Sequence, residues 1–513
     1  MPSEMKKLGR TVKANQPTTV MHVNGKSDEG VVPLKSLNKP GRSGAVVMEG
    51  RPLTEGNLKQ PIEAKTQCLD APSLSGLQRI RKAARDDKGL RFTALFHHIT
   101  PELLGASYEA LDPHAASGID GVTWAEYGED VSRHIVDLHR RLHAGSYRAQ
   151  PSRRVWIPKA DGKQRPLGIA ALEDKIVQRA VGTILETIYE TDFAGFSYGF
   201  RPGRSQCGAL DALWTGLTSR PVNWILDADI KSFFDTLDHQ WLMKFVSHRI
   251  ADRRIHRLIQ KWLKAGVCEE GTRTETTQGV PQGAVISPLL ANLYLHHVFD
   301  LWVKWWRKHE AQGEVIVVRY ADDTVIGFQS KPDAERFLGL LKERFGKFSL
   351  ELHPDKTRLI EFGKFATANR RRRQEGKPET FAFLGFTHIA GKRRSDGGYT
   401  VLRHSIARRV NEKIAQIREH LLSIRSTAIK EQGKWLGSVV GGWLNYHAIP
   451  TNSVAIARFR WQIIGAWRAT LRRRSQTAYR TTGWRHMRRL AEKFLPPAII
   501  LHPYPNRRHV VTT

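Results

Sequence analysis

Two adjacent aspartates, Asp322 and Asp323, stand inside the hydrophobic segment RYADDTVIGF at residues 319–328. The runs on either side are rich in β-branched and aromatic residues, so they predict two short strands joined by a tight turn at 321–323. Neighbouring carboxylates repel each other and are costly to bury without a cation. A hard divalent ion would resolve this conflict, although a solvent-exposed turn, where Asp is common, explains this segment equally well.

A second acidic segment, WILDADIKSFFDTLDH at residues 224–239, begins with a strand pattern that runs directly into Asp229. If this strand lies beside the predicted hairpin, the carboxylates of Asp229, Asp322 and Asp323 converge. Such a set suits two Mg²⁺ ions, which prefer carboxylate oxygens and keep coordination positions open for phosphates. The expected chemistry is phosphoryl transfer, in which a 3′-hydroxyl is activated at one ion and a triphosphate is held at the other.

The composition predicts a large basic protein. The chain has 513 residues with 81 Lys and Arg against 50 Asp and Glu, a net charge of +31, and 40% of its residues are hydrophobic. This length suits about two to four domains. The charge predicts a polyanionic partner, of which nucleic acid is the first candidate. A basic protein on a membrane surface is the alternative, but no apolar run approaches the roughly 18 residues of a spanning helix, so no membrane partner is expected.

The beginning of the chain and its cysteines point to an intracellular protein. Cys68, Cys207 and Cys268 are far apart and form no C-x-x-C pair, so neither a disulfide framework nor a zinc ribbon is expected. No apolar segment follows the basic start, so no secretory signal and a cytoplasmic location are expected. A nucleoid-associated, bacterial setting is expected as well. Residues 1–70 are rich in Gly, Pro, Ser, Lys and Asn without an apolar period, and they predict a disordered, basic N-terminal extension.

The central part of the chain, residues 77–386, alternates helical and strand patterns and predicts an α+β fold. A helix is expected after Ser287 and Pro288, with one apolar face packed against the sheet. That predicted face consists of Leu290, Leu293, Tyr294, His297, Val298, Leu301 and Trp305.

Residues 391–513 predict a basic helical region, with 24 Lys and Arg against 5 Asp and Glu, a net charge of +19. Tryptophans are interleaved with these charges, as in helices that pack through one face and meet phosphates with the other. Ordinary core packing is the alternative for each of them. They are Trp435, Trp443, Trp461, Trp467 and Trp484.

Six segments together resemble the motifs of group II intron reverse transcriptase/maturases, over roughly residues 77–513. One such motif alone is weak, whereas six in the family's order are specific. In chain order they are WIPKADGKQRPLGI (156–169), YGFRPGRS (198–205), DIKSFF (229–234), QGVPQGAVISPLLANLYL (278–295), YADD (320–323) and FLGF (383–386).

The resemblance implies a right-hand polymerase of the α+β class. Fingers and palm would span residues 77–390, an α-helical thumb or maturase domain 395–475, and a basic DNA-binding region 476–513. The implied partners are group II intron RNA, a DNA target with its primer, and dNTPs, with Mg²⁺ as cofactor. Many family members also end in a nuclease with paired cysteines and histidines, and without such pairs no endonuclease is expected here.

Asp229, Asp322 and Asp323 match the family's metal-binding triad. Phe234, five residues after Asp229, matches the aromatic side chain that blocks a ribose 2′-hydroxyl and so selects dNTPs; on its own it would be read as a core aromatic. Lys356 matches a lysine proposed as the general acid for pyrophosphate, a role that stays open.

Lys159 and Arg165 match cations of the fingers that grip the incoming triphosphate, as charge-assisted hydrogen bonds allow. An isolated basic pair would more often be a solvated surface. Gln282 matches the residue near primer and nucleotide, while Gly283 would allow close backbone approach. Two departures affect loop stiffness: Ala284 stands where Gly is common, and Gly-Ile-Ala at 168–170 replaces a usual Gly-Ile-Pro.

Two segments resemble regions that bind nucleic acid in the family. SGIDGVTWAEY at 117–127 resembles the extension that lengthens the fingers, and Arg472, Arg473 and Arg474 form an arginine block in the part that resembles the maturase domain. The thumb would follow the backbone of a duplex by its shape and phosphates. The basic run at 370–373 contributes to this surface or forms a solvated loop.

The leading hypothesis is an intron-encoded RNA-directed DNA polymerase that assists splicing and copies its intron at a DNA target. One alternative is an RNA-binding splicing cofactor with an idle polymerase centre, against which the intact aspartate triad argues. Another is a host-domesticated reverse transcriptase in defence or repair. An RNA-templated RNA polymerase is disfavoured because Phe234 should exclude ribonucleotides.

Overall fold

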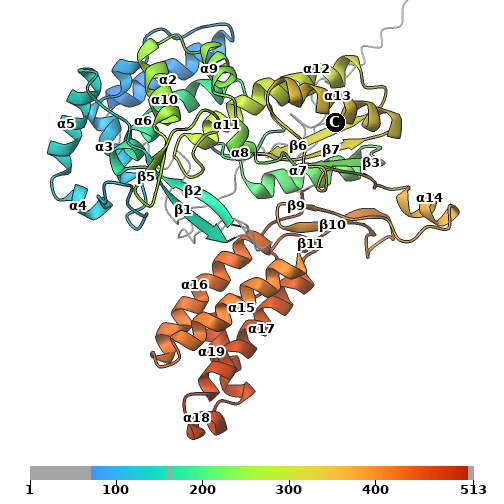
Figure 1. Cartoon of the computed structure of the whole chain (residues 1–513). Coiled ribbons are helices and arrows are strands. Elements are labelled where there is room, and N and C mark those ends of the chain that lie inside the picture. The colour runs from blue at the N-terminus through green and yellow to red at the C-terminus, as the bar shows by residue number, and fades with distance from the viewer. Residues whose placement is uncertain (1–70, 159–163, 506–513) are drawn as a thin grey trace, which may run out of the picture.

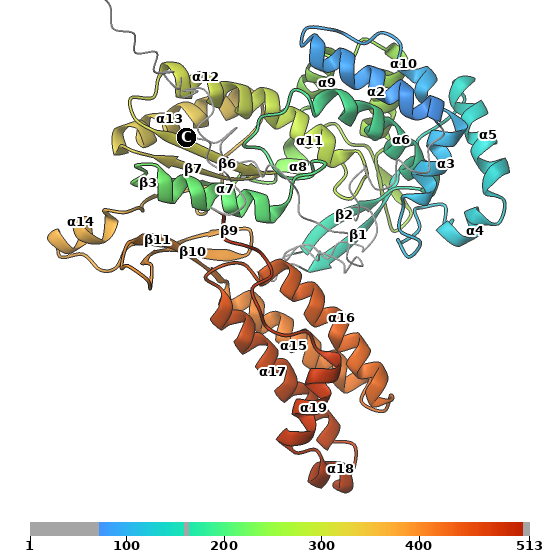
Figure 2. The same ribbon diagram turned by 180° about the vertical axis from the view of Figure 1, so that it is seen from behind.

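The computed structural model describes residues 71–158 and 164–505 (Figure 1). The predictions made for Lys159 and for residues 1–70 lie outside the described residues. The rest divides into two lobes that lie side by side and a helical bundle that extends away from them (Figures 1 and 2).

The first lobe contains a four-stranded sheet in the order β2-β1-β4-β5. These strands are β1 (Ser152–Pro158), β2 (Gln164–Ile169), β4 (Val267–Glu269) and β5 (Thr272–Thr274). Helices pack around them because each has an apolar stripe that the shared core covers. They are α2 (Ala71–Asp86), α3 (Pro101–Glu109), α4 (Trp124–Gly128), α5 (Val131–His143), α6 (Leu172–Tyr189), α9 (His239–Ser247) and α10 (Arg253–Lys264), with a 3₁₀ turn at Phe96–His98.

The second lobe is built on an antiparallel sheet in the order β6-β7-β3-β8. Its strands are β3 (Trp224–Ala228), β6 (Val315–Tyr320), β7 (Asp323–Phe328) and β8 (Arg358–Glu361). Helix α7 covers one face, and α12 and α13 cover the other (Figure 1). The helices of this lobe are α7 (Gln206–Ser219), α8 (Phe233–Thr236), α11 (Ser287–Leu295), α12 (Leu301–His309) and α13 (Lys331–Lys347).

The helix predicted after Pro288 does not keep a regular period. A π-helical turn at His296–Asp300 joins α11 to α12. The extra residue of such a turn rotates the following helix by about 100°. The predicted buried face is therefore correct in α11 but wrong for Leu301 and Trp305, which are exposed, whereas Val303 and Trp306 are buried in their place.

A third sheet, in the order β11-β10-β9, connects the second lobe to the helical bundle. It contains β9 (Phe381–Phe383), β10 (Phe386–Lys392) and β11 (Tyr399–Ser405), and α14 (Ala366–Arg372) precedes it. The bundle helices are α15 (Ala407–Ser423), α16 (Ile429–His447), α17 (Ser453–Arg472), α18 (Gln476–Thr481) and α19 (Trp484–Phe494).

The bundle has one hydrophobic core. Side chains of α15, α16, α17 and α19 contribute to it, among them Leu421, Trp443, Trp467 and Met487. Helix α19 therefore packs on the helices before it, and a separate DNA-binding role for 476–513 stays a prediction. Sheets with packed helices and a helical C-terminal region confirm the α+β class. Among the described residues, no helix has the length and apolarity that crossing a membrane requires.

Candidate active site

The predicted acidic hairpin is present. β6 and β7 pair antiparallel, with Tyr320 opposite Asp323, so the turn consists of Ala321 and Asp322. Ala321 has a positive φ of 58°, a left-handed conformation that a two-residue hairpin turn requires. Both strands are almost entirely buried, which leaves the two carboxylates at the end of the hairpin.

The structure brings Asp229 to this turn, as the sequence predicts. β3 pairs antiparallel with β7 and its last pair is Ala228 with Thr324, so Asp229 and Asp323 follow on adjacent strands. Burial, with the nearby carboxylates of Asp227, Asp322 and Asp229, raises the pKa of Asp323 well above its usual range. The three predicted aspartates are therefore neighbours in space.

Asp227 belongs to the same acidic group, and the sequence reasoning missed it. Burial raises its pKa to about 6, although Arg358 on β8 lies 3.7 Å from its carboxylate and lowers it. Residues i and i+2 of a strand point to the same side. The spacing of Asp227 and Asp229 in WILDADIK was the signal that could have identified it.

The chemistry of these carboxylates fits a hard divalent cation. Carboxylate oxygens are the ligands that Mg²⁺ prefers, and burial together with three neighbouring carboxylates raises the pKa of Asp323, so a cation there would stabilise its charged form. Within residues 71–158 and 164–505, however, no three His, Cys, Asp or Glu side chains are grouped closely enough to hold an ion. Asp229 is instead paired with Lys356, whose Nζ lies 2.9 Å from its Oδ2.

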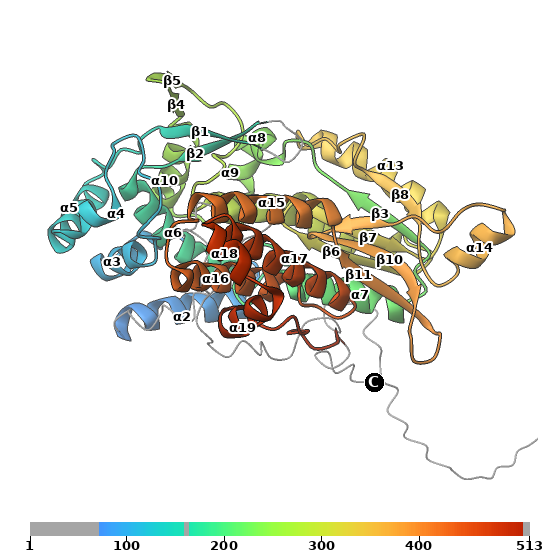
Figure 3. The same ribbon diagram turned by 90° about the horizontal axis from the view of Figure 1, so that it is seen from below.

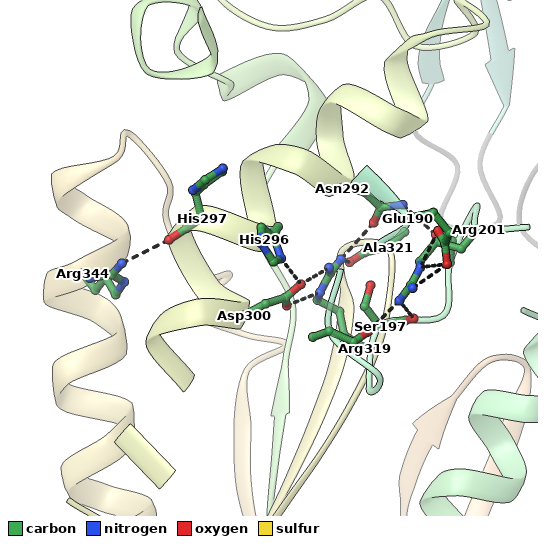
Figure 4. A network of polar contacts seen from close by, with 12 residues as sticks. Glu190, Ser197, Arg201, Asn292, His296, His297, Asp300, Arg319, Ala321 and Arg344 are labelled. Atoms are coloured by element: carbon green, nitrogen blue, oxygen red, sulfur yellow. Dashed lines mark hydrogen bonds and ion pairs between the residues drawn. The ribbon is translucent and has the colours of Figure 1, made fainter. Parts of the chain in front are cut away.

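Arg319, in strand β6, is buried beside the acidic turn and contacts its backbone (Figure 4). Its Nε and Nη2 donate to the two carboxylate oxygens of Asp300 at 2.8 and 2.6 Å. Its Nη1 donates to Oδ1 of Asn292 at 3.0 Å and to the carbonyl of Ala321 at 2.9 Å. A planar guanidinium that satisfies these acceptors together fixes the orientation of the turn.

Asp300 comes from the π-helical turn, which places its carboxylate on Arg319. Burial raises the pKa of Asp300, but Arg319 and His296 more than offset this and hold it below its usual range. Sequence reasoning missed both members of this pair. The available signal was a charged residue inside an otherwise apolar segment, VIVVRY for Arg319 and HHVFDLW for Asp300.

The YGFRPGRS segment supports the turn from another direction. Nδ2 of Asn292 donates to the carbonyl of Gly199 at 2.7 Å. A Cβ at Gly199 would lie 2.3 Å from the backbone nitrogen of Ala321, so only glycine fits there. Arg201 fixes the same loop by donating to Glu190 and to the carbonyl of Ser197 (Figure 4).

The FLGF segment contacts the acidic group directly. The backbone of Leu384 lies beside the carboxylate of Asp323 and lowers its pKa slightly, against the larger effect of burial. Leu384 and Gly385 both have positive φ, 46° and 80°, which turns the chain toward that carboxylate. The hydroxyl of Tyr446 in α16 donates to the carbonyl of Leu384 at 2.9 Å. Leu384 therefore links helix α16 of the bundle to the acidic site.

Arg165 and Gln282, predicted to bind the nucleotide, contact each other. Nε of Arg165 donates to Oε1 of Gln282 at 2.6 Å, and Nε2 of Gln282 donates to Asp235 at 3.3 Å. Gly283 has a φ of 111°, and a Cβ there would lie 2.9 Å from the carbonyl oxygen of Gly168. The close backbone approach predicted for Gly283 is thus made to β2 of the protein.

Phe234 is only 5% exposed and packs in the main hydrophobic core, with its ring edge-to-face on Phe233. Its carbonyl accepts from the backbone N–H of Val280, in the loop that leads to Gln282. Phe234 therefore combines core packing with a place beside the predicted nucleotide residues. Its selection of dNTPs stays a prediction.

The three arginines of the predicted nucleic-acid block have different environments. The guanidinium of Arg472 stacks 3.6 Å from the ring centroid of Tyr479, and Arg473 is exposed. Arg474 donates to the backbone carbonyl of Thr427 and so helps to hold α17 in the bundle. Contact of all three with nucleic acid stays a prediction.

Comparison with known proteins agrees with this geometry. Residues 157–388 match the family described as reverse transcriptase (RNA-dependent DNA polymerase). Protein YkfC of Escherichia coli strain K12 is 37% identical over 326 residues, which cover 56% of this chain and 84% of YkfC. The group II intron-encoded protein LtrA of Lactococcus lactis is 36% identical over 294 residues, 56% of this chain and 48% of LtrA.

An uncharacterized 91 kDa protein in the cob intron of Schizosaccharomyces pombe is 39% identical over 171 residues, 33% of this chain and 21% of that protein. The chain thus spans most of one relative but only about half of LtrA. The matched segments include the acidic turn and the strand that brings Asp229 to it. The chain therefore belongs to the group II intron reverse transcriptase/maturase family.

Proposed function

We propose that the protein is the RNA-directed DNA polymerase of a group II intron, which binds intron RNA to assist splicing and copies it into DNA at a target site. The observation that carries this proposal is the position of Asp229 and Asp323 at adjacent ends of β3 and β7, with Asp322 beside them in the turn. Membership of the reverse transcriptase family and the similarity to intron-encoded proteins support the choice of template.

Asp229, Asp322 and Asp323 would hold two Mg²⁺ ions, which when bound supply the positive charge needed at the 3′-hydroxyl and the triphosphate. Asp229 would exchange its exposed ion pair with Lys356 for the metal, which is inexpensive because exposed pairs contribute little. The freed ammonium of Lys356 would then lie beside the leaving pyrophosphate and could donate a proton to it.

Arg165 and Gln282 would bind the incoming dNTP at the junction of fingers and palm, and Lys159 would join them. The guanidinium of Arg165 has donors beyond the Nε that contacts Gln282, and they suit phosphate oxygens. Phe234 would fill the space that a ribose 2′-hydroxyl requires. The basic bundle, with its excess of Lys and Arg, would contact intron RNA and the primer–template duplex.

Primer extension on an RNA template in Mg²⁺ tests this function. Asp322→Ala is expected to reduce dNTP incorporation by at least about a thousandfold, because the metal loses a ligand. Asp396→Ala, at an exposed turn between β10 and β11 that is paired with Arg393, is the matched control and should act like wild type. Full activity of Asp322→Ala would overturn the polymerase assignment.

Splicing of a group II intron precursor by Asp322→Ala separates the two proposed roles. Splicing with DNA synthesis abolished is expected, since RNA binding does not require the metal site. A wild-type protein that assists splicing but incorporates no dNTP would favour a splicing cofactor with an idle polymerase centre.

A further inference from the structure

Two tryptophans on the helical bundle expose stacked indole rings. Trp461 of α17 is 60% exposed and Trp484 of α19 is 44% exposed. Their ring centroids are 4.8 Å apart and their planes differ by 8°. Trp467 of the same helix is fully buried and is the tryptophan by which α17 packs in the bundle core. Packing of the bundle does not explain the exposure of the other two.

The stacked pair belongs to a stripe along one face of α17, which we call the aromatic–arginine stripe. Its α17 positions Trp461, Gly465, Arg468 and Arg472 are spaced by four, three and four residues, which places them on one side of the helix. A Cβ at Gly465 would lie 4.0 Å from the ring of Trp484, so this ring extends over the glycine.

Arginines continue the stripe toward the far end of the bundle. The guanidinium of Arg468 lies 4.7 Å from the ring centroid of Trp484. One turn further, Arg472 stacks on Tyr479 of α18, whose ring is 58% exposed. Figure 3 shows α19 and α15 on opposite sides of α17, so the side built with α19 is not the side that packs on α15.

The charge around the stripe favours a polyanion. The sequence has no Asp or Glu between Glu431 and Glu492, whereas this span contains eleven Lys and Arg residues. Planar guanidinium groups and exposed indoles bind phosphates and the faces of bases, respectively. In a duplex these faces are covered by neighbouring base pairs, so an indole face is used only by an unpaired base.

We propose that the aromatic–arginine stripe binds a single-stranded segment of nucleic acid, with an unpaired base stacked on Trp461 and the flanking phosphates held by Arg468 and neighbouring arginines. The recognition is independent of base sequence, because every base has a face that can stack. Single-stranded RNA and DNA share this chemistry. The inference rests on the proposed function for the presence of nucleic acid, but not on DNA synthesis.

Fluorescence anisotropy of the full chain with labelled 12-nucleotide probes, U12 and dT12, and a 12-base-pair duplex tests the proposal. Trp461→Ala should weaken single-strand binding by roughly 5- to 150-fold, the effect of losing one base stack, while duplex binding changes less than about twofold. Trp461→Phe should recover most of the loss. Trp305→Ala, on α12 and 50% exposed, is the matched control and should leave both affinities unchanged.

The difference between the U12 and dT12 losses tells whether RNA or DNA is the preferred strand. Equal losses for single strands and duplex, or unchanged binding in Trp461→Ala, would overturn the proposal. If Trp461→Ala abolishes self-association but leaves oligonucleotide binding unchanged, the stripe instead binds a second copy of the chain. Because this binding is measured without dNTPs, it does not depend on DNA synthesis. A wild-type protein that makes no DNA would therefore refute the polymerase function without affecting this result.

Discussion

Arg319 and Asp300 form a buried ion pair with two hydrogen bonds, and the same guanidinium binds the carbonyl of Ala321 in the acidic turn. Both side chains are fully shielded from water. Because Arg319 both neutralises a buried carboxylate and holds the turn, it connects the folding of the second lobe to the placement of its aspartates.

Arg319→Met should lower the free energy of unfolding by roughly 3–5 kcal/mol, because Asp300 is left buried without its partner. Adding Asp300→Leu should recover much of this loss, since no buried charge then needs a partner. Urea unfolding of both variants measures the difference. DNA synthesis should stay impaired in the recovered double variant, and wild-type kcat there would refute a positioning role for Arg319.

Gly199→Ala should displace the acidic turn, because the added Cβ would lie 2.3 Å from the backbone nitrogen of Ala321. A misplacement of about 1 Å reduces catalysis by roughly a hundredfold, whereas the expected loss of stability is only about 1–3 kcal/mol. Gly105→Ala in α3 meets no atom within 4 Å and should leave primer extension unchanged. Equal activities of the two variants would contradict the close approach.

Tyr446→Phe should reduce kcat more than it changes the KM for dNTP. The variant removes the hydrogen bond to Leu384, whose backbone lies beside Asp323, but it keeps the ring stacked on Phe386. The expected cost in stability is about 0.5–1.5 kcal/mol. Tyr399→Phe is the control, since its buried hydroxyl has no hydrogen-bond partner among the described residues and its loss should cost nothing.

Phe234→Ala should increase the use of rNTPs relative to dNTPs, measured as the ratio of their kcat/KM values on an RNA template. The truncation also leaves a cavity in the core, which costs about 3–5 kcal/mol. Phe233→Ala provides the control, because its ring is equally buried beside Phe234. If both variants change the sugar preference alike, a loosened core and not Phe234 explains the effect.

His388→Phe should remove part of the loss of stability that acidification causes. Burial, and Arg403 beside it, lower the pKa of His388 to about 3. The unfolded chain takes up this proton near pH 6.5, so the contribution of His388 is fully present above that pH and is lost as the pH falls toward 3. Between pH 7 and 5 the loss is about 2 kcal/mol.

Thermal unfolding at both pH values measures this effect. The phenyl ring can keep the stack that His388 makes on Phe381, with planes 8° apart. His404→Phe, at an exposed position of β11, should keep the pH dependence of wild type. A His388→Phe protein with the full acid sensitivity of wild type would show that other groups cause it.

The local pattern of the chain determined the acidic hairpin, the strand that ends before Asp229 and the helical character of the C-terminal region. Those features follow from the spacing of apolar residues along a single element. The same rule failed in α12, because a π-helical turn rotated Leu301 and Trp305 into solvent. No residue spacing in that segment marks the inserted turn.

Only the tertiary structure decided what holds the aspartates in place. The contacts that do so join separate segments of the chain. Asp300 binds Arg319, Gly199 packs against Ala321, and Leu384 lies beside Asp323. Spacing in the sequence sets which side of an element a side chain occupies, but not which other element covers that side. A charge so covered loses its hydration, so folding is favourable only where packing also brings a partner.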